Sequence, residues 1–318
     1  MALLPKPLTP TVDRIFESYV RTNGDWRRPH LGASLIGQQC YRSLWYTFRW
    51  CTKPKFDGRI LRLFDSGKRQ ESRIVNDLRN IGVEVYDIDP DTGNQIHYET
   101  YGGHFAGSLD GIARGFPESK QWHVVEIKTM NKKNFAKLLK EGLFKAKYEH
   151  YSQIQTYLGW SKLERGYYFA VCKDTDEIYG ERLEFNKETF DYNLFKAEGV
   201  IFADTPCERF SENAGNFACK FCEHHEMCHG NRLPEVSCRT CVNVTPTEDG
   251  KWTCLRRGNV SLDMLDQKQA CDKHAFIPQL VPLEVVDADA VKGTVTYAGG
   301  ITNGPGAIAS RDLQSYIP

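Results

Sequence analysis

The stretch between residues 107 and 128 carries two carboxylates and a lysine on what reads as a β-hairpin. Side chains on a strand alternate between its faces, so Glu126 and Lys128 project the same way from the second half of this stretch. A turn across residues 114–121 would return the chain and bring Asp110 beside Glu126. The sequence therefore predicts two carboxylates and one lysine at one end of a sheet.

Such a group of side chains suits a divalent cation held against a phosphate. Two carboxylates a few ångströms apart repel unless a cation lies between them, and hard oxygen ligands favour Mg²⁺ or Mn²⁺. A lysine beside that cation can hold an attacking water and offset the charge that builds on a phosphate. The combination indicates phosphodiester hydrolysis, although Asp, Glu and Lys also occur together on solvated strands without any chemical role.

Two predicted helices add polar residues to this group. From Tyr148 to Trp160 the apolar residues recur at helical spacing, which places Gln153 and Tyr157 one turn apart on a neighbouring face. In a second predicted helix, Glu71 lies on the same stripe as several aliphatic residues. Burying its carboxylate there is costly unless something pairs it, and a metal ion would do so. The alternative is a solvated residue at the edge of the stripe.

Together these residues resemble the motifs of a known nuclease family. The order G-x-x-D, E-x-K and Q-x-x-x-Y looks like the RecB-like branch of the PD-(D/E)XK nuclease superfamily, and an upstream G-x-x-x-E resembles the helix motif that precedes them there. The matching residues are Gly107 and Asp110, Glu126 and Lys128, Gln153 and Tyr157, and Gly67 and Glu71.

The resemblance implies roles for these residues and an activity. It implies that Mg²⁺ or Mn²⁺ is held by Asp110, Glu126, the Ile127 carbonyl and Glu71, with Lys128 as the catalytic lysine. Gln153 and Tyr157 would then position that lysine or the DNA backbone. The implied activity is exonuclease action on DNA ends or single strands, in recombination, repair or phage DNA processing. An endonuclease or nickase, and a non-catalytic nucleic-acid-binding scaffold, are the alternatives.

The cysteines indicate metal binding. Eight of the eleven cysteines fall between Cys207 and Cys271, and in a reducing compartment clustered thiols bind metals more often than they form disulfides. The first cluster has the spacing C-x₂-C-x₅-C, in which three thiolates can reach one ion. Its members are Cys219, Cys222 and Cys228, and the candidates for a fourth ligand are Cys207, His224, His225, His229 and the distant Cys40.

A second cluster has the spacing C-x₂-C-x₁₂-C-x₁₆-C. This pattern fits a small zinc ribbon, in which a segment too short to own a hydrophobic core folds around its ion. Such a module could contact DNA, dock a recombination or replication protein, or cap the main domain. Its ligands would be Cys238, Cys241, Cys254 and Cys271.

The first cluster also takes part in a resemblance. RecB-like nucleases of the AddB type, and the related CRISPR-adaptation nucleases, carry one cysteine ahead of the nuclease motifs and three behind them, which hold a [4Fe-4S] cluster. Ser34-x₅-Cys40-x-Arg42, followed much later by C-x₂-C-x₅-C, resembles that arrangement. The resemblance implies that Cys40, Cys219, Cys222 and Cys228 hold an iron-sulfur cluster. A local zinc site completed by Cys207 is the alternative.

Composition limits the class of protein. The formal net charge is zero, so no global positive field indicates nucleic acid. Locally, the stretch from Lys128 to Lys147 holds seven lysines and one acidic residue, which could follow a phosphate backbone or simply line the wet face of a helix. No apolar run is long enough to cross a bilayer and no secretory signal is recognisable, so we expect a cytoplasmic protein without a membrane partner.

The order of predicted elements indicates a mixed α/β fold: a restriction-endonuclease-like core with a mixed sheet flanked by helices, and a cysteine-rich, metal-bound C-terminal extension. Residues 1–10, with three prolines, should be extended. The predicted divisions are a helical segment at 1–60 that contributes Cys40, a nuclease core at 61–205, a cysteine knuckle at 206–232, a zinc-ribbon-like module at 233–282 and a tail at 283–318. The predicted helices are 11–22, 35–48, 66–80, 131–142 and 148–160, and the predicted strands are 83–87, 95–100, 104–113, 122–129, 166–173, 177–185 and 293–297.

Overall fold

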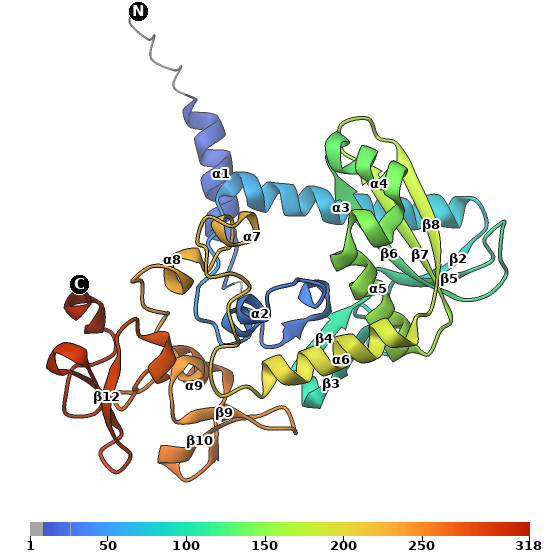
Figure 1. Cartoon of the computed structure of the whole chain (residues 1–318). Coiled ribbons are helices and arrows are strands. Elements are labelled where there is room, and N and C mark those ends of the chain that lie inside the picture. Colours follow the sequence, from blue (N-terminus) through green and yellow to red (C-terminus); the bar gives the residue numbers. More distant parts are fainter. Residues whose placement is uncertain (1–8, 26) are drawn as a thin grey trace, which may run out of the picture.

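The computed structural model describes residues 9–25 and 27–318, so most of the predicted extended lead-in lies outside the described residues. The molecule is elongated, with an α/β lobe at one end and the chain after residue 206 at the other (Figure 1). Helices α3 (Gly58–Asn80) and α6 (Lys187–Ile201) run between the two ends. No helix in the described part of the chain is both long and apolar enough to cross a membrane.

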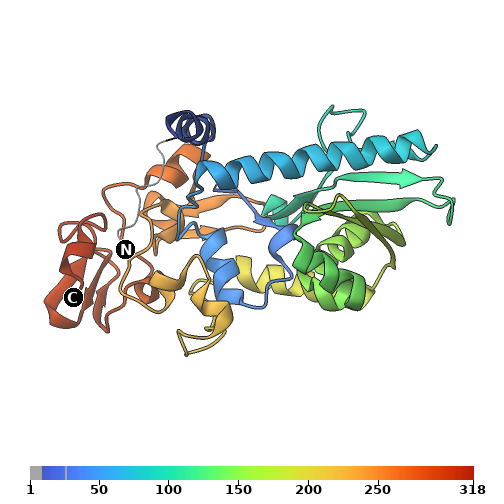
Figure 2. The ribbon, with the colours of Figure 1, turned by 90° about the horizontal axis from the view of Figure 1, so that it is seen from above.

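The main sheet has five strands in the order β2-β5-β6-β7-β8. Strands β6 and β7 are parallel, and the crossover between them consists of two helices; the other neighbouring strands are antiparallel. Helix α3 covers one face of this sheet and the crossover helices cover the other (Figure 2). The predicted mixed sheet flanked by helices is confirmed. The strands are β2 (Glu84–Tyr86), β5 (Gly111–Arg114), β6 (His123–Met130), β7 (Arg165–Cys172) and β8 (Ile178–Glu184), and the helices are α4 (Lys132–Ala146) and α5 (Tyr148–Ser161).

Strand β6 is buried on both faces, and its successive side chains point to opposite faces of the sheet as predicted. Val125 and Ile127 pack with Ile74, Val75 and Leu78 of α3 in one apolar cluster. Val124 and Met130 belong to the other, larger cluster, which includes residues of α5 and β7. Glu126 and Lys128 have the same parity as Val124 and Met130, so they face the α5 side.

A second, three-stranded sheet changes one sequence prediction. The strand predicted over residues 104–113 is two strands, because the chain leaves one sheet and enters another at Leu109 and Asp110. β4 (Phe105–Ser108) pairs with β1 (Leu31–Gly32) and β3 (His97–Thr100), whereas β5 belongs to the main sheet. Asp110 therefore lies at the point where the chain switches sheets.

The helix predicted over residues 35–48 is also wrong in its first half. After α1 (Pro10–Thr22) and a short 3₁₀ turn at Ala33–Leu35, helix α2 covers only Tyr41–Phe48. Cys40 is the residue that caps α2, and its sulfur accepts a hydrogen bond from the Ser43 N–H at 3.4 Å. Its thiol consequently lies at a helix end rather than on an apolar helix face.

The C-terminal region has more strands than predicted. Residues 283–318 contain a three-stranded sheet in place of the one predicted strand, and Val295, Tyr297 and Leu313 pack in a cluster with Phe276. The elements after α6 are α7 (Phe217–Lys220), α8 (His225–Cys228), β9 (Val244–Pro246), β10 (Trp252–Cys254), β11 (Val260–Ser261), α9 (Met264–Gln269), β12 (Val285–Asp289), β13 (Thr294–Tyr297) and β14 (Ile301–Asn303).

A buried arginine ties this region to the N-terminal part of the chain. Arg239 is 1% exposed, and its guanidinium lies 3.7 Å from the Trp50 ring centroid and 4.4 Å from that of Trp252. It donates hydrogen bonds to the carbonyls of Phe48 and Pro29, both at 2.9 Å. Cation–π and carbonyl contacts take the place of a carboxylate partner, so this charge is buried without an ion pair among the described residues.

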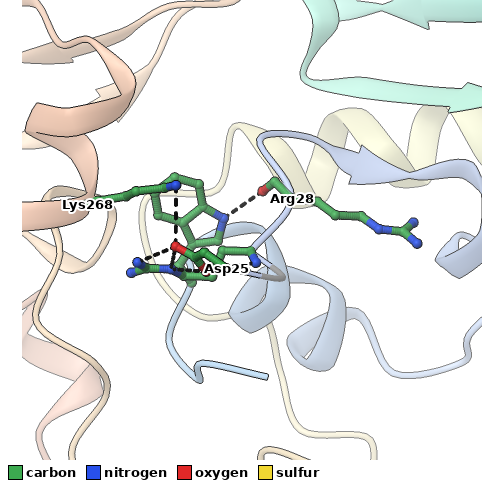
Figure 3. Close-up of polar contacts among 5 residues, drawn as sticks. Asp25, Arg28 and Lys268 are labelled. Atoms are coloured by element: carbon green, nitrogen blue, oxygen red, sulfur yellow. Dashed lines mark hydrogen bonds and ion pairs between the residues drawn. The ribbon is translucent and has the colours of Figure 1, made fainter. Parts of the chain in front are cut away.

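A nearby ion pair makes a second connection (Figure 3). Asp25 binds Arg27 at 2.6 Å and Lys268 of α9 at 3.3 Å. The Trp50 indole N–H donates to the Arg28 carbonyl at 2.6 Å in the same region. The N-terminal segment therefore contacts the cysteine-rich region through side chains as well as through the buried arginine.

Candidate functional site

Asp110 reaches β6 through its side chain. Gly111 pairs with Val125, so the next residue pair would continue the β5–β6 ladder, but the chain turns away at Asp110. The Asp110 carboxylate instead accepts the Ile127 N–H at 2.7 Å. The N–H and C=O of one strand residue point to the same edge, so the Ile127 carbonyl lies on the Asp110 side. The hairpin predicted across residues 114–121 is present and brings Asp110 to Glu126.

Glu126 and Lys128 form an ion pair on the α5 side of β6. The Glu126 side chain is 1% exposed and its second carboxylate oxygen has no hydrogen-bond partner among the described residues, whereas the Lys128 side chain is 27% exposed. Burial raises the pKa of Glu126, against the effect of Lys128. Burial alone would lower the pKa of Lys128, but Glu126 and Asp110 together outweigh it and raise that pKa.

Glu71 lies within electrostatic range of Asp110 and Lys128. It is half-buried on α3, and its side chain forms no hydrogen bond or ion pair with another described residue. Burial raises its pKa and the Asp110 charge raises it further, while Lys128 opposes both effects. Burial also raises the pKa of Asp110. The pKa of all three carboxyl groups is thus raised despite the charge of Lys128, and a hard divalent cation bound among them would favour their ionised forms.

Gln153 and Tyr157 support the segment that leads to Asp110. Both are buried on α5, and the Gln153 amide donates to the Tyr157 hydroxyl at 3.2 Å. That hydroxyl donates to the Ser108 carbonyl at 2.9 Å. Gly107 is required here, because a Cβ at this position would lie 2.7 Å from the Tyr157 hydroxyl oxygen. The pair therefore binds the end of β4 and fixes the position of the segment that leads to Asp110.

Sequence reasoning missed two residues beside this site, His150 and Tyr168. Tyr168 pairs with Glu126 across β6 and β7, and its hydroxyl lies 2.8 Å from Nδ1 of His150. Burial, and then the charge of Lys128, lowers the pKa of His150 to about 3, so the imidazole is neutral. His150 lies three residues before Gln153, and this helical spacing was the available signal. Tyr168 became visible only through strand pairing.

The four cysteines predicted to hold an iron-sulfur cluster lie in the lining of one pocket. Cys40, Cys219, Cys222 and Cys228 all line one cavity of about 450 Å³. The Cys222 thiol lies 3.8 Å from the hydroxyl of Ser43, the residue whose N–H binds the Cys40 sulfur. Cys207 lines a neighbouring cavity that it shares with Cys40. Cys40 therefore borders both pockets, and Cys207 only the second.

The second cysteine set also shares a cavity. Cys238, Cys241, Cys254 and Cys271 line a space of about 170 Å³. Burial, followed by the neighbouring thiols of this set, raises the pKa of Cys238 to about 12. Both ring nitrogens of His274 already face Ser310 and Ser237, at 2.8 and 3.0 Å. The pocket lining also includes the exposed Asp272, and its four thiols are a soft set suited to zinc.

Neither the carboxylates nor the thiols are arranged with the geometry of a metal-binding site. Among the described residues, no three His, Cys, Asp or Glu side chains are arranged to hold an ion. In the carboxylate group, Asp110 is occupied by the Ile127 N–H and Glu126 by Lys128. Binding of a cation there would require these side chains to exchange partners.

Comparison with known proteins finds only a weak structural likeness. Neither a protein-family model nor a curated protein matches the sequence. The alkaline exonuclease LHK-Exo from Laribacter hongkongensis is similar at 17% identity and a TM-score of 0.41, over 58% of this chain and 90% of that one. The structure of LHK-Exo in complex with dAMP is similar at 16% identity and a TM-score of 0.40, over 59% of this chain and 89% of that one. The structure of SSO0001 is similar at 16% identity and a TM-score of 0.41, over 69% of this chain and 96% of that one. At these values the likeness says nothing about the activity of this chain.

The raised pKa of Glu126 predicts how stability depends on pH. A carboxyl whose pKa is higher in the folded state favours folding while it is protonated, and that contribution is lost as the pH rises. Metal-free protein should therefore lose unfolding free energy from about pH 5 towards about pH 8. Glu126→Gln should lose less over the same range. Urea denaturation at each pH measures both.

The control is Glu164→Gln, at a side chain that is 84% exposed. It should follow the wild-type pH dependence. Identical pH dependence in wild type and Glu126→Gln would show that the Glu126 carboxyl does not titrate differently in the folded protein.

Proposed function

We propose that this protein is a Mg²⁺- or Mn²⁺-dependent nuclease that hydrolyses DNA, acting as an exonuclease on ends or single strands. The observation that carries the proposal is the convergence of Asp110, Glu126 and Lys128 where β5 and β6 meet. This acid–acid–lysine set lies in a partly buried position, with the Glu71 carboxylate within electrostatic range. A purely structural ion pair would need neither Asp110 nor Glu71.

The donors present fit a hard divalent cation. Asp110, Glu126 and the Ile127 carbonyl would hold it, with Glu71 as a further ligand, and the unpaired oxygen of Glu126 is a buried acceptor that lacks a partner among the described residues. When bound, the cation would supply Lewis-acid stabilisation of the phosphate and a lower pKa for a bound water. Gln153 and Tyr157 would keep Asp110 in place by holding Ser108.

Lys128 is the residue that faces both the acids and the exterior. Its ammonium binds Glu126, yet 27% of its side-chain surface is exposed to solvent. An ammonium has three donors, so donors not used by Glu126 can hold an attacking water and a phosphate oxygen. The raised pKa keeps the group charged throughout the physiological range. We therefore assign Lys128 to charge stabilisation and orientation rather than to proton removal.

Cleavage assays with Lys128→Ala test this function. With Mg²⁺ or Mn²⁺, wild type should degrade linear DNA, and Lys128→Ala should be slower by about a hundredfold or more, because a fixed charge opposite the developing negative charge is lost. Lys173→Ala, at an exposed lysine in the turn after β7, is the control and should remain active.

Substrate topology separates the alternatives in the same assay. Covalently closed circles should resist an exonuclease, whereas equal rates on circular and linear DNA would identify an endonuclease or nickase. Wild-type protein that leaves both substrates intact while binding them would contradict the enzyme assignment and favour a scaffold.

We also propose that the two cysteine sets bind different metals. Cys40, Cys219, Cys222 and Cys228 would hold a [4Fe-4S] cluster, and Cys238, Cys241, Cys254 and Cys271 a structural zinc ion. The support is that each set lines one cavity of its own. A cluster on the first set would join the cap of α2 to the segment after α6 and would stabilise the fold by closing a long loop.

Metal analysis of cysteine variants tests this assignment. Protein purified without oxygen should be brown, with about four iron atoms and about one zinc ion per chain. Cys40→Ser should lose the colour and the iron but keep the zinc, because it removes a ligand from only one set. Cys172→Ala is the control, since Cys172 is buried in the α/β core and lines neither cavity. A colourless wild-type protein with two zinc ions would contradict the cluster.

A further inference from the structure

An exposed aromatic group lies at the junction of α4 and α5, outside the metal-binding residues. Phe144 is 53% exposed. Its ring centroid lies 5.6 Å from that of Tyr148 and 4.9 Å from that of Tyr151, at interplanar angles of 81° and 87°. Both tyrosines contact Phe144 edge to face rather than in a parallel stack, and about half of the residue remains exposed.

The segment that carries Phe144 is rich in lysine, and most of these lysines have no acidic partner among the described residues. Between Lys132 and Lys147 the chain has six lysines and one acidic residue. Five of the six are exposed, and in the described part of the chain only Lys137 forms an ion pair, with Glu141 at 3.8 Å. An excess of positive charge that is not neutralised within the protein attracts a polyanion.

The backbone at Gly142 places Phe144 on this surface. Gly142 has φ 71°, a conformation that L side chains rarely adopt, and it interrupts the regular helix geometry of α4. The next residue, Leu143, is buried, and its N–H donates to the Glu181 carboxylate at 2.8 Å. The chain is thus anchored to β8 immediately before Phe144, which fixes the position of the ring.

The junction lies over the same face of the sheet as the candidate site. Tyr168 pairs with Glu126 on one side and with Glu181 on the other, so these three residues form a row across β6, β7 and β8. His150 contacts Tyr168 and Leu143 contacts Glu181 from above. With strands about 4.8 Å apart, Glu181 lies about 10 Å from Glu126. Leu143, the residue before Phe144, is therefore held at a strand residue about 10 Å across the sheet from Glu126.

We propose that Phe144, with Lys140 and Lys145, forms a binding site for single-stranded DNA, in which a base stacks on the Phe144 ring and the lysines contact backbone phosphates. The placing of this site relative to Glu126 rests on the proposed nuclease function, and the site specifies its substrate. A base in a duplex is already stacked and paired, so only an unpaired strand can use the ring. The excess of positive charge beside an exposed ring combines the two features that a single strand can use at once, phosphates for the lysines and a base for the ring.

Binding of a fluorescein-labelled oligo(dT) of about twelve nucleotides tests the site without relying on cleavage. Full-length protein is titrated in metal-free buffer and followed by fluorescence anisotropy. Phe144→Ala should bind about tenfold more weakly than wild type, because it removes one stacked base. Phe144→Trp should bind at least as tightly as wild type, whereas Phe144→Leu, which is apolar but has no π face, should be as weak as the alanine variant.

Two controls accompany these variants. Phe195→Ala removes a phenylalanine that is 69% exposed on α6, and it should bind like wild type. Lys145→Ala should reduce the slope of log affinity against log salt by about 0.7, the value for one phosphate contact on a single strand. The affinity for a blunt hairpin duplex should change little in Phe144→Ala.

Equal affinities of Phe144→Ala and Phe195→Ala would overturn the proposal, and so would wild-type affinity in Phe144→Leu or an equal loss on the duplex. These results are separable from the nuclease assignment. If wild type cleaves no DNA but its binding of oligo(dT) depends on Phe144, the nuclease proposal fails and the binding site stands. If wild type cleaves DNA and its binding is independent of Phe144, the reverse holds.

Discussion

A carboxylate and an ammonium, held side by side on an interior strand, are the constraint on which the rest of the α/β lobe depends. Glu126 is almost completely buried, and the sheet offers its second oxygen no partner among the described residues. A buried charge survives only with compensation, and removal of either member leaves the other uncompensated. Lys128, two residues along the same strand, supplies that compensation for Glu126, whereas the Asp110 charge opposes it.

The same constraint explains the second, smaller sheet. If β4 and β5 were one strand, the backbone would continue the ladder and Asp110 would pair with β6 through its main chain. The switch between sheets frees the Asp110 side chain to accept the Ile127 N–H instead. The hydrogen bond from Tyr157 to Ser108, and the absence of a side chain at Gly107, hold that switch in place. The glycine, the aspartate and the tyrosine of the motifs thus serve one local geometry.

Patterns of short range were predictable from the sequence, and contacts set by tertiary structure were not. The period of two in β6 placed Glu126 and Lys128 on one face, and helical spacing placed Gln153 beside Tyr157. The sheet switch at Asp110 leaves no signal in local propensity, because residues 104–113 are compatible with one strand. Likewise, local pattern placed Cys40 within the predicted helix 35–48, and its grouping with Cys222 came from the resemblance and not from spacing. The ordered C-terminal sheet depends on packing against Phe276, which composition does not reveal.

The most direct test of the central claim is the position of a bound cation. Crystals grown with Mn²⁺ should give an anomalous difference peak within about 2.0–2.4 Å of one carboxylate oxygen from each of Asp110 and Glu126. Lys128 should have turned from Glu126 towards the exterior. An ion bound by only one of these carboxylates, or a site that stays empty at saturating Mn²⁺ with the Glu126–Lys128 pair intact, would contradict the account.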